Sequence, residues 1–247
     1  STINQDYYWM AKAIRLAQRG LYTTSPNPRV GCVIVSPDNH CVGEGAHLKA
    51  GTPHAEVHAL KQAGDLAKGA TAYVTLEPCS HFGRTPPCAE ALIHAQVKRV
   101  VIAMTDPNPN VSGNGIRKLQ NAGIEVTSDV MSAEAGALNP GFVKRMLTGK
   151  PYVRVKQGIS LDGKIALKNG VSQWITGPEA RQDVHKYRAQ SCAVLTGSGT
   201  VEADNPSLLV RPSEAKLSAY PLDTLRQPVR VIVDGQSRLD NHYQCFK

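Results

Sequence analysis

Aromatic residues are scarce in this sequence, at 5% of 247 residues. Proteins that bind single-stranded nucleic acid stack the bases on aromatic rings, so the composition argues against such a platform. A basic tail or Lys/Arg run is also missing. Residues 1–150 hold 15 Lys+Arg and 11 Asp+Glu, and residues 151–247 hold 13 and 9, so each part carries +4. A diffuse basic excess suits small anionic substrates as well as nucleic acid, and does not choose between them.

Long apolar runs are missing as well. No stretch approaches the roughly 20 apolar residues that a membrane-spanning helix needs. The first residues, Ser1–Asp6, are polar and unlike a signal peptide. We therefore expect a cytoplasmic protein without membrane partners, whose six cysteines are reduced. In an intracellular chain of this length, such cysteines point to metal binding rather than to disulfides.

Helical and strand patterns alternate in the first part of the chain. Apolar spacing predicts a helix over 3–20, a hairpin over 30–46 and a helix that opens at Thr52-Pro53. Strands and helices then alternate until a last helix over 133–147. This order predicts a sheet with helices on both faces, in a domain that spans residues 1–149.

A second pattern begins at Lys150. It predicts a strand over 152–159, a helix over 178–188 and strands over 193–196 and 229–234. These elements indicate a second α/β domain over residues 150–247.

His54, Glu56, Cys79 and Cys88 carry the clearest chemistry. Catalytic zinc needs three protein ligands and an open position for water, whose pKa the metal lowers. One imidazole and two thiolates supply the three ligands here. A carboxylate that is not a ligand must carry the proton to the leaving nitrogen, and Glu56 fills that role. The pattern predicts hydrolytic deamination of a small nitrogen heterocycle.

The spacing of these residues constrains the geometry. Residues two apart on a helix point to nearly opposite sides, so His54 and Glu56 can face one metal only at the N-terminal end of a helix. Cys88 follows Pro86-Pro87 and is expected at the start of a second helix. Two helix N-termini directed at the metal would favour thiolates.

A structural zinc site is the alternative interpretation. Such a site usually closes with a fourth protein ligand, for which Cys32 and Cys41 are candidates. Cys32 lies inside an apolar run, and a structural site has no need of Glu56, so we favour catalysis. Four further histidines have no partner pattern and are expected at the surface: His40, His94, His185 and His242.

The Cys79–Cys88 spacing is unusual, because eight residues stand where the deaminase signature has two. With this insert, TLEPCSHFGRTPPC (75–88) strongly resembles one family, the bacterial bifunctional deaminase/reductases of riboflavin biosynthesis. Further segments that resemble the family are NPRVG (27–31), HAEVHAL (54–60), SLDGK (160–164) and SQWIT (172–176).

The resemblance implies a cytidine-deaminase-like α/β/α domain followed by a dihydrofolate-reductase-like α/β domain. It implies that the 2-amino group of 2,5-diamino-6-ribosylamino-4(3H)-pyrimidinone 5′-phosphate is removed at Zn²⁺, and that NADPH then reduces the ribosyl group to ribityl. A homodimer or homotetramer without a nucleic-acid partner is expected. The family's reductase half continues well beyond Lys247, so we expect only its N-terminal part here, with an inactive reductase as the alternative.

The resemblance also assigns site residues. Those implied to contact the deaminase substrate are Asn27, His47, His81, Arg84, Thr85, Asp106 and Asn108. Those implied to contact the reductase substrate are Lys156, Ser172, Arg188, Leu208 and Arg211. Those implied to bind the cofactor are Gly158, Trp174, Thr200, Asp204 and Gly235. From the residues alone, Arg84 suits a phosphate fork, whereas Asp106 equally suits an ordinary turn.

Two rival functions remain open. A tRNA adenosine deaminase or cytidine deaminase would share the fold, but it would be expected to carry the short Cys-x-x-Cys and would leave the second domain unexplained. A zinc-stabilised binding module without catalysis would not depend on Glu56.

Overall fold

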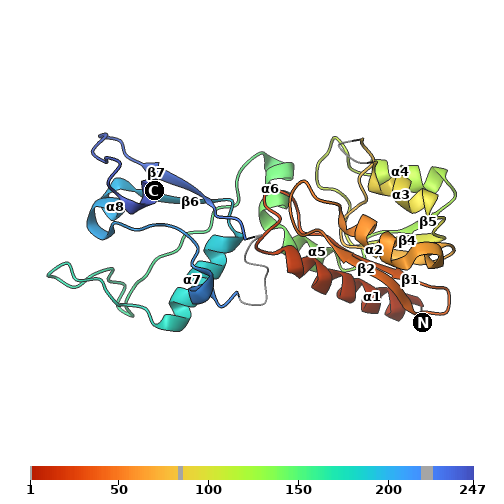
Figure 1. The fold of residues 1–247 in the computed structure, drawn as a ribbon, viewed down its shortest axis with the longest axis horizontal. Coiled ribbons are helices and arrows are strands. Elements are labelled where there is room, and N and C mark those ends of the chain that lie inside the picture. Colours follow the sequence, from red (N-terminus) through yellow and green to blue (C-terminus); the bar gives the residue numbers. More distant parts are fainter. Residues whose placement is uncertain (1, 83–85, 218–224) are drawn as a thin grey trace. The chain divides into compact units, whose positions relative to one another are not determined.

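The computed structural model describes residues 2–82, 86–217 and 225–247. They divide into two compact units, Ser1–Tyr152 and Val153–Lys247, a few residues beyond the boundary expected at Gly149 (Figure 1). Among the described residues, no helix is long and apolar enough to cross a membrane.

A five-stranded mixed sheet forms the centre of the first unit, in the order β2-β1-β3-β4-β5. The strands are β1 (Gly31–Val35), β2 (Cys41–Ala46), β3 (Thr71–Val74), β4 (Arg99–Ile102) and β5 (Glu125–Thr127). β1 pairs antiparallel with β2 and β3, whereas β3, β4 and β5 run parallel. The carboxyl ends of β3 and β4 therefore meet at one edge of the sheet, where the candidate site lies.

Helices cover both faces of this sheet (Figure 1). They are α1 (Thr2–Ala17), α2 (Ala55–Ala63), α3 (Cys88–His94), α4 (Asn114–Asn121), α5 (Ser132–Leu138) and α6 (Pro140–Thr148), with short 3₁₀ turns at Gln18–Gly20 and Gly64–Ala67. α1 and α5 pack on one face, and α2, α3 and α4 pack on the other. The predicted three-layer α/β/α domain is confirmed.

The single helix predicted over 133–147 is wrong, because the structure forms α5 and α6 instead. The break falls at Asn139-Pro140. Proline has no N–H to continue the hydrogen-bond ladder of α5, but it suits the first turn of a new helix.

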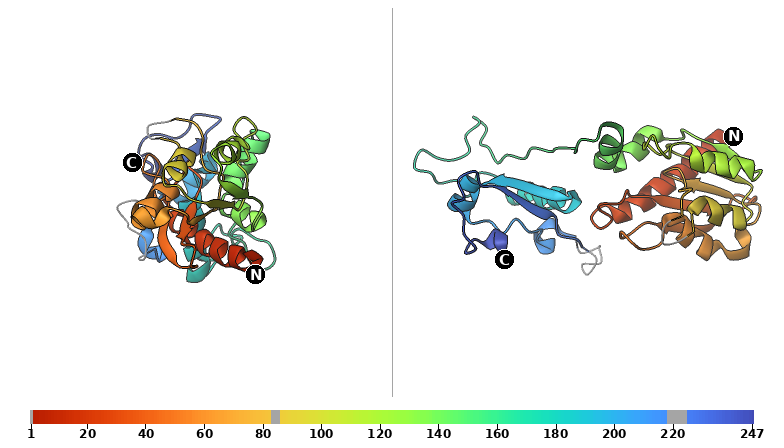
Figure 2. Two further views of the ribbon diagram at one scale, coloured as in Figure 1. Left: turned by 90° about the vertical axis from the view of Figure 1, so that its right-hand side faces the viewer. Right: turned by 90° about the horizontal axis from the view of Figure 1, so that it is seen from above.

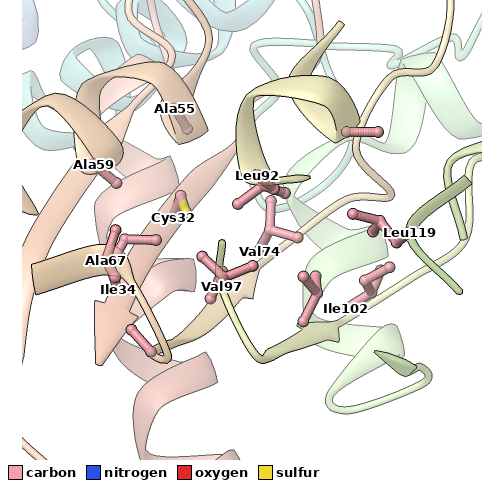
Figure 3. Packing of buried hydrophobic residues seen from close by; sticks show 14 of the residues in the cluster. Cys32, Ile34, Ala55, Ala59, Ala67, Val74, Leu92, Val97, Ile102 and Leu119 are labelled. Atoms are coloured by element: carbon pink, nitrogen blue, oxygen red, sulfur yellow. The ribbon is translucent and has the colours of Figure 1, made fainter. Parts of the chain in front are cut away.

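Two apolar clusters lie above and below the sheet. The cluster beneath α2, α3 and α4 contains small side chains such as Ala55 and Ala59, with larger ones such as Leu92 and Leu119 (Figure 3). Ala89 on α3 belongs to the same cluster. Cys32 is fully buried in the same cluster and is part of the core. Small side chains on the inner faces of α2 and α3 let both helices lie close to the sheet.

Close contact between α2 and β2 depends on Gly45. A Cβ atom there would lie 2.4 Å from the carbonyl oxygen of Ala55 and 2.7 Å from the Cβ of His58. A side chain at residue 45 would therefore push α2 away from the sheet. Gly45 therefore sets the distance between the sheet and the first turn of α2. This turn carries the residues next to the candidate site.

A buried ion pair joins α1 to the sheet. The guanidinium of Arg99 on β4 donates two hydrogen bonds of 2.8 Å to the carboxylate of Asp6 on α1. The hydroxyl of Tyr73 on β3 donates a third, of 3.0 Å. Bidentate geometry and the extra donor offset the desolvation cost of these charges.

The second unit contains a two-stranded parallel sheet of β6 (Ala193–Gly197) and β7 (Val229–Val233). Its helices are α7 (Pro178–Gln190), α8 (Ser198–Asp204) and α9 (Pro212–Ala215), with a 3₁₀ turn at Gln244–Phe246. The sequence patterns predicted α7 and both strands but not the two short helices α8 and α9.

The strand predicted over 152–159 is wrong. The segment between Val153 and Gly177 contains no helix or strand and runs as an extended loop (Figure 2). A strand needs a neighbour for its backbone hydrogen bonds. Among the described residues, β6 and β7 pair only with each other. Val153 and Val155 are consequently exposed, at 69% and 79%.

Replacement of Asp6 by Asn should destabilise the first unit by about 3 kcal/mol, because it removes the buried, bidentate counter-ion of Arg99 and leaves only the exposed carboxylate of Glu125, 3.4 Å from Nε of Arg99. Denaturant unfolding can be followed by the fluorescence of Trp9, which lies in the α1 core, after the other tryptophan, Trp174, is replaced by Phe. Glu44→Gln is the control, since its ion pair with Lys12 is partly solvated and should change stability by about 1 kcal/mol at most. Equal effects of the two variants would contradict the importance of the buried pair.

Candidate metal centre and substrate site

Three metal-ligating side chains converge at one edge of the first unit. The ligand atoms of His54, Cys79 and Cys88 lie within 4.8 Å of one another. Nδ1 of His54 is 3.2 Å from Sγ of Cys88 and 3.8 Å from Sγ of Cys79. Within the described parts of the chain, this is the one such cluster of His, Cys, Asp or Glu residues.

Two helix starts and one strand end bring the three side chains together. His54 is the N-cap of α2, two residues after Thr52, where the sequence predicted the helix to open. Cys88 is the first residue of α3, after the N-cap Pro87. Cys79 lies in the loop that follows β3. At the start of a helix, His54 and Glu56 can both face the metal site. Inside a helix, two residues that are two positions apart would point to nearly opposite sides.

Hydrogen bonds around Cys79 favour its thiolate. The Cys88 side chain and the His54 ring donate to its sulfur, and the backbone N–H of Cys88 does so at 3.2 Å. These contacts lower the pKa of Cys79 to about 4. The same sulfur–sulfur contact, together with burial, raises the pKa of Cys88. One imidazole and two sulfurs, one of them with a lowered thiol pKa, form a donor set that fits zinc.

Glu56 lies beside this cluster without belonging to it. It is in the first turn of α2, and its carboxyl group is buried and contacts Cys88. Burial raises its pKa, so the carboxyl group is suited to hold a proton.

Neither candidate for a fourth protein ligand reaches the cluster. Cys32 is buried in the core, where burial raises the pKa of its thiol. Cys41 is on β2, where its sulfur contacts the Gly43 carbonyl and the Glu44 carboxylate. Three ligands without a fourth among the described residues fit a catalytic zinc centre, which keeps one position open, better than they fit a closed structural site.

Each of the two units matches a known protein family. Residues 3–104 match the family model for the cytidine and deoxycytidylate deaminase zinc-binding region, and residues 151–247 match that for the RibD C-terminal domain. A solved structure of Acinetobacter baumannii RibD is 57% identical, with a TM-score of 0.93 over 98% of this chain and 67% of that one. The chain belongs to the RibD family.

Other RibD relatives give the same result. The riboflavin biosynthesis protein RibD of Escherichia coli is 60% identical over 95% of this chain. A Thermotoga maritima structure described as a diaminohydroxyphosphoribosylaminopyrimidine deaminase/5-amino-6-(5-phosphoribosylamino)uracil reductase is 42% identical, with a TM-score of 0.89 over all of this chain and 68% of that one. The chain spans 65% of the length of E. coli RibD and 66% of that of Haemophilus influenzae RibD.

His47 and Asn27, which the RibD resemblance places in the substrate site, contact each other. Nδ1 of His47 is 3.1 Å from the Pro53 carbonyl oxygen, and Nε2 is 3.1 Å from Nδ2 of Asn27. Because a carbonyl oxygen only accepts, Nδ1 carries the hydrogen and Nε2 accepts from the Asn27 amide. His47 is buried, which lowers its pKa and favours this neutral form. The amide oxygen of Asn27 is left as an acceptor.

His81 and Asp106 line a small cavity next to Cys79. Oδ1 of Asp106 accepts a hydrogen bond of 2.9 Å from the backbone N–H of Asn108. This contact is typical of an aspartate in a turn, which is the alternative that the sequence left open for Asp106. Burial raises the pKa of Asp106. The remaining two implied substrate contacts, Arg84 and Thr85, lie outside the described residues.

Three substrate residues implied for the reductase lie near one another in the second unit. Nη1 of Arg188 on α7 donates to the Leu209 carbonyl, next to the buried Leu208. Burial and the nearby charge of Arg211 lower the pKa of Arg188. Two neighbouring guanidinium groups form a surface that suits an anionic group.

His185 was expected at the surface, and that prediction is wrong, because the residue is 3% exposed. Its Nδ1 accepts the backbone N–H of Arg211 at 3.2 Å, and its Nε2 lies 3.0 Å from Glu214. The other oxygen of Glu214 pairs with the Arg211 guanidinium at 3.0 Å. His185 thus helps to hold Arg211 in place. His40, His94 and His242 are exposed.

The other reductase residues are in two places. Lys156, Gly158, Ser172 and Trp174 are in the extended segment before α7, where the Arg181 guanidinium stacks on Trp174 at 4.3 Å. Those on or near α8 are Thr200, Asp204 and Gly235. Arg238 bridges the turn after Gly235 to α8 through Ser198 and Glu202.

The metal site can be tested by cysteine substitution. Cys79→Ser and Cys88→Ser should each abolish tight zinc binding, because a hydroxyl is a poor substitute for a thiolate ligand. Cys41→Ser and Cys192→Ser are matched controls outside the cluster and should keep it. Metal binding by the cluster variants and the control variants is measured as zinc content per chain and as the thiolate absorption of the cobalt-substituted protein. Metal loss in a control variant as large as in the cluster variants would contradict the assignment.

Proposed function

We propose that this chain catalyses a step of riboflavin biosynthesis, the hydrolytic removal of the 2-amino group from 2,5-diamino-6-ribosylamino-4(3H)-pyrimidinone 5′-phosphate. The observation that carries this proposal is a three-ligand His/Cys/Cys cluster with a buried carboxyl group, Glu56, that is not one of its ligands. Membership of the RibD family and the deaminase activity for which the T. maritima relative is named support the choice of substrate.

His54, Cys79 and Cys88 would hold zinc, which when bound supplies a Lewis acid that activates water for attack on the ring carbon. Glu56 takes the water proton and delivers it to the nitrogen that leaves as ammonia. Its burial suits this task, because burial raises the pKa of the carboxyl group and so favours the protonated form that delivers the proton to the leaving nitrogen. The α3 backbone N–H that binds Cys79 keeps the sulfur in its ligating form.

Asn27 and the residues beyond Cys79 are proposed to orient the substrate. The amide oxygen of Asn27, fixed by His47, accepts a hydrogen bond from an amino or ring N–H of the pyrimidinone. His47 and His81 are proposed to line the ribose-phosphate side, and Asp106 and Asn108 are proposed as further substrate contacts. Arg84 and Thr85 bind the phosphate, where a guanidinium provides a bidentate fork.

The second unit is proposed to carry the NADPH-dependent reduction of the ribosyl group to ribityl. Lys156, Ser172, Arg188, Leu208 and Arg211 would bind the substrate. Gly158, Trp174, Thr200, Asp204 and Gly235 would bind NADPH. The alternative is that the reductase is inactive in this chain, which spans about two thirds of its relatives' length. A homodimer or homotetramer and a cytoplasmic location stay predictions.

Glu56→Gln should lower the rate of ammonia release by about 10²–10⁴-fold, because the amide cannot carry the proton. Zinc content should be unchanged, since Glu56 is not a ligand. Glu134→Gln is a matched control, because Glu134 also lies in the first turn of a helix but is exposed. Ammonia release and zinc content are measured on wild type and both variants.

The same measurements separate the rival functions. A zinc-stabilised binding module would give no ammonia, and its function would survive Glu56→Gln. An enzyme that acts on nucleosides or RNA would leave the ribosylaminopyrimidinone phosphate intact when loaded with zinc. RNA affinity would in that case fall steeply with salt.

A further inference from the structure

Glu77 has a buried carboxylate whose partners are backbone N–H groups. Oε2 accepts the N–H of Asp106 at 2.9 Å and that of Gly113 at 3.0 Å. Oε1 accepts the N–H of Gly115 at 2.9 Å and that of Ile116 at 3.3 Å. Among the described residues, no lysine or arginine pairs with this carboxylate, although it is only 6% exposed. Four amide dipoles therefore replace the water that the charge has lost.

These four N–H groups belong to one segment. Asp106 follows β4, Gly113 is the N-cap of α4, and the other two residues are in the first turn of α4. Glu77 itself follows β3 and stands two residues before Cys79. The carboxylate therefore joins the metal loop after β3 to the 106–116 segment after β4, across the carboxyl ends of two parallel strands.

Steric fit at Gly115 shows how closely the two loops approach. A Cβ atom at this residue would lie 2.1 Å from the Pro78 carbonyl oxygen and 3.3 Å from Oε1 of Glu77. Any side chain would force the two loops apart. Glu77, Cys79, His81 and Asp106 all line the same small cavity, so the position of the 106–116 segment sets the shape of that cavity.

We propose that Glu77 is a positioning residue for deamination, whose carboxylate clamps the 106–116 segment to the metal loop so that Asp106 and Asn108 meet the substrate in a preformed arrangement. This inference rests on the proposed function, which makes these two residues substrate contacts. A clamp of this kind lowers KM by removing the cost of ordering the segment during binding. It leaves the zinc ligands and Glu56 unchanged.

Glu77→Gln tests the clamp with almost no change of shape. Each carboxylate oxygen accepts two N–H groups, so either orientation of a glutamine amide directs its NH₂ group at two donors. KM for the ribosylaminopyrimidinone phosphate should rise about tenfold or more. The kcat per bound zinc should change much less. Glu90→Gln is the matched control, because Glu90 forms a partly exposed ion pair with Lys118, and its KM should stay at the wild-type value.

Gly115→Ala is the second variant, since it separates the loops and leaves the carboxylate intact. It should raise KM in the same way, whereas Gly136→Ala on α5, where an added Cβ meets nothing within 4 Å, should not. If Glu77 acts through the segment, its effect on KM should be non-additive with that of Asn108→Ala. Full additivity would contradict the proposal, as would a loss of zinc or kcat at unchanged KM.

Amide hydrogen exchange gives a readout that does not need turnover. The N–H groups of Gly113 and Gly115 should exchange faster in Glu77→Gln than in wild type, while those of β3 keep their protection. Unchanged exchange at both glycines would overturn the clamp. If zinc-loaded wild type releases no ammonia from this substrate, the proposed function fails, and exchange decides the clamp independently. The same variants are then compared on whichever aminopyrimidine or nucleoside wild type deaminates.

Discussion

The need to hold three ligand atoms within 4.8 Å of one another constrains the rest of the first unit. The ligands come from three separate elements: the start of α2, the loop after β3 and the start of α3. Each element must approach the carboxyl end of β3 closely. Alanine side chains under α2 and α3 and the missing side chain at Gly45 allow this approach, because larger groups would lift the helices off the sheet. The composition of the core therefore serves the geometry of the site.

The sequence predicted best what depends on local spacing. His54 and Glu56 are two residues apart, so their relation to one helix start follows from helix geometry alone. The layered α/β order of the first unit also follows from local apolar periods. Predictions failed where the secondary structure depends on a partner far away in the sequence or on a single residue. Residues 152–159 have a strand-like composition, but the described chain offers them no pairing strand. One helix over 133–147 was expected from its apolar spacing, yet the missing N–H of Pro140 divides it.

Buried polar partners are the part of the site that the sequence does not show. The partners of Glu77 are backbone N–H groups, which nearly every residue has, so no residue type along the chain marks them. His185 has partners on the segment around Arg211, 26 residues away, which no helical spacing links to it. The sequence does hold a weak signal for Glu77: an acidic residue directly after an apolar strand, in the motif that carries a metal ligand. A buried charge there requires several donors, but only the fold identifies them.

Backbone groups orient the side chains closest to the proposed chemistry. The Pro53 carbonyl fixes the His47 ring, which in turn fixes the Asn27 amide. The Cys88 N–H binds the Cys79 sulfur, and four N–H groups bind Glu77. Backbone dipoles held by a sheet and its helices move less than long side chains do, so they keep the groups that they orient in place without substrate. A deaminase must distinguish the amino group of its substrate from the carbonyl group of its product. An amino group donates hydrogen bonds and a carbonyl oxygen accepts them, so the distinction depends on whether the protein holds a fixed acceptor or a fixed donor at that position. We therefore expect selectivity to depend on these backbone contacts as much as on the side chains that touch the substrate.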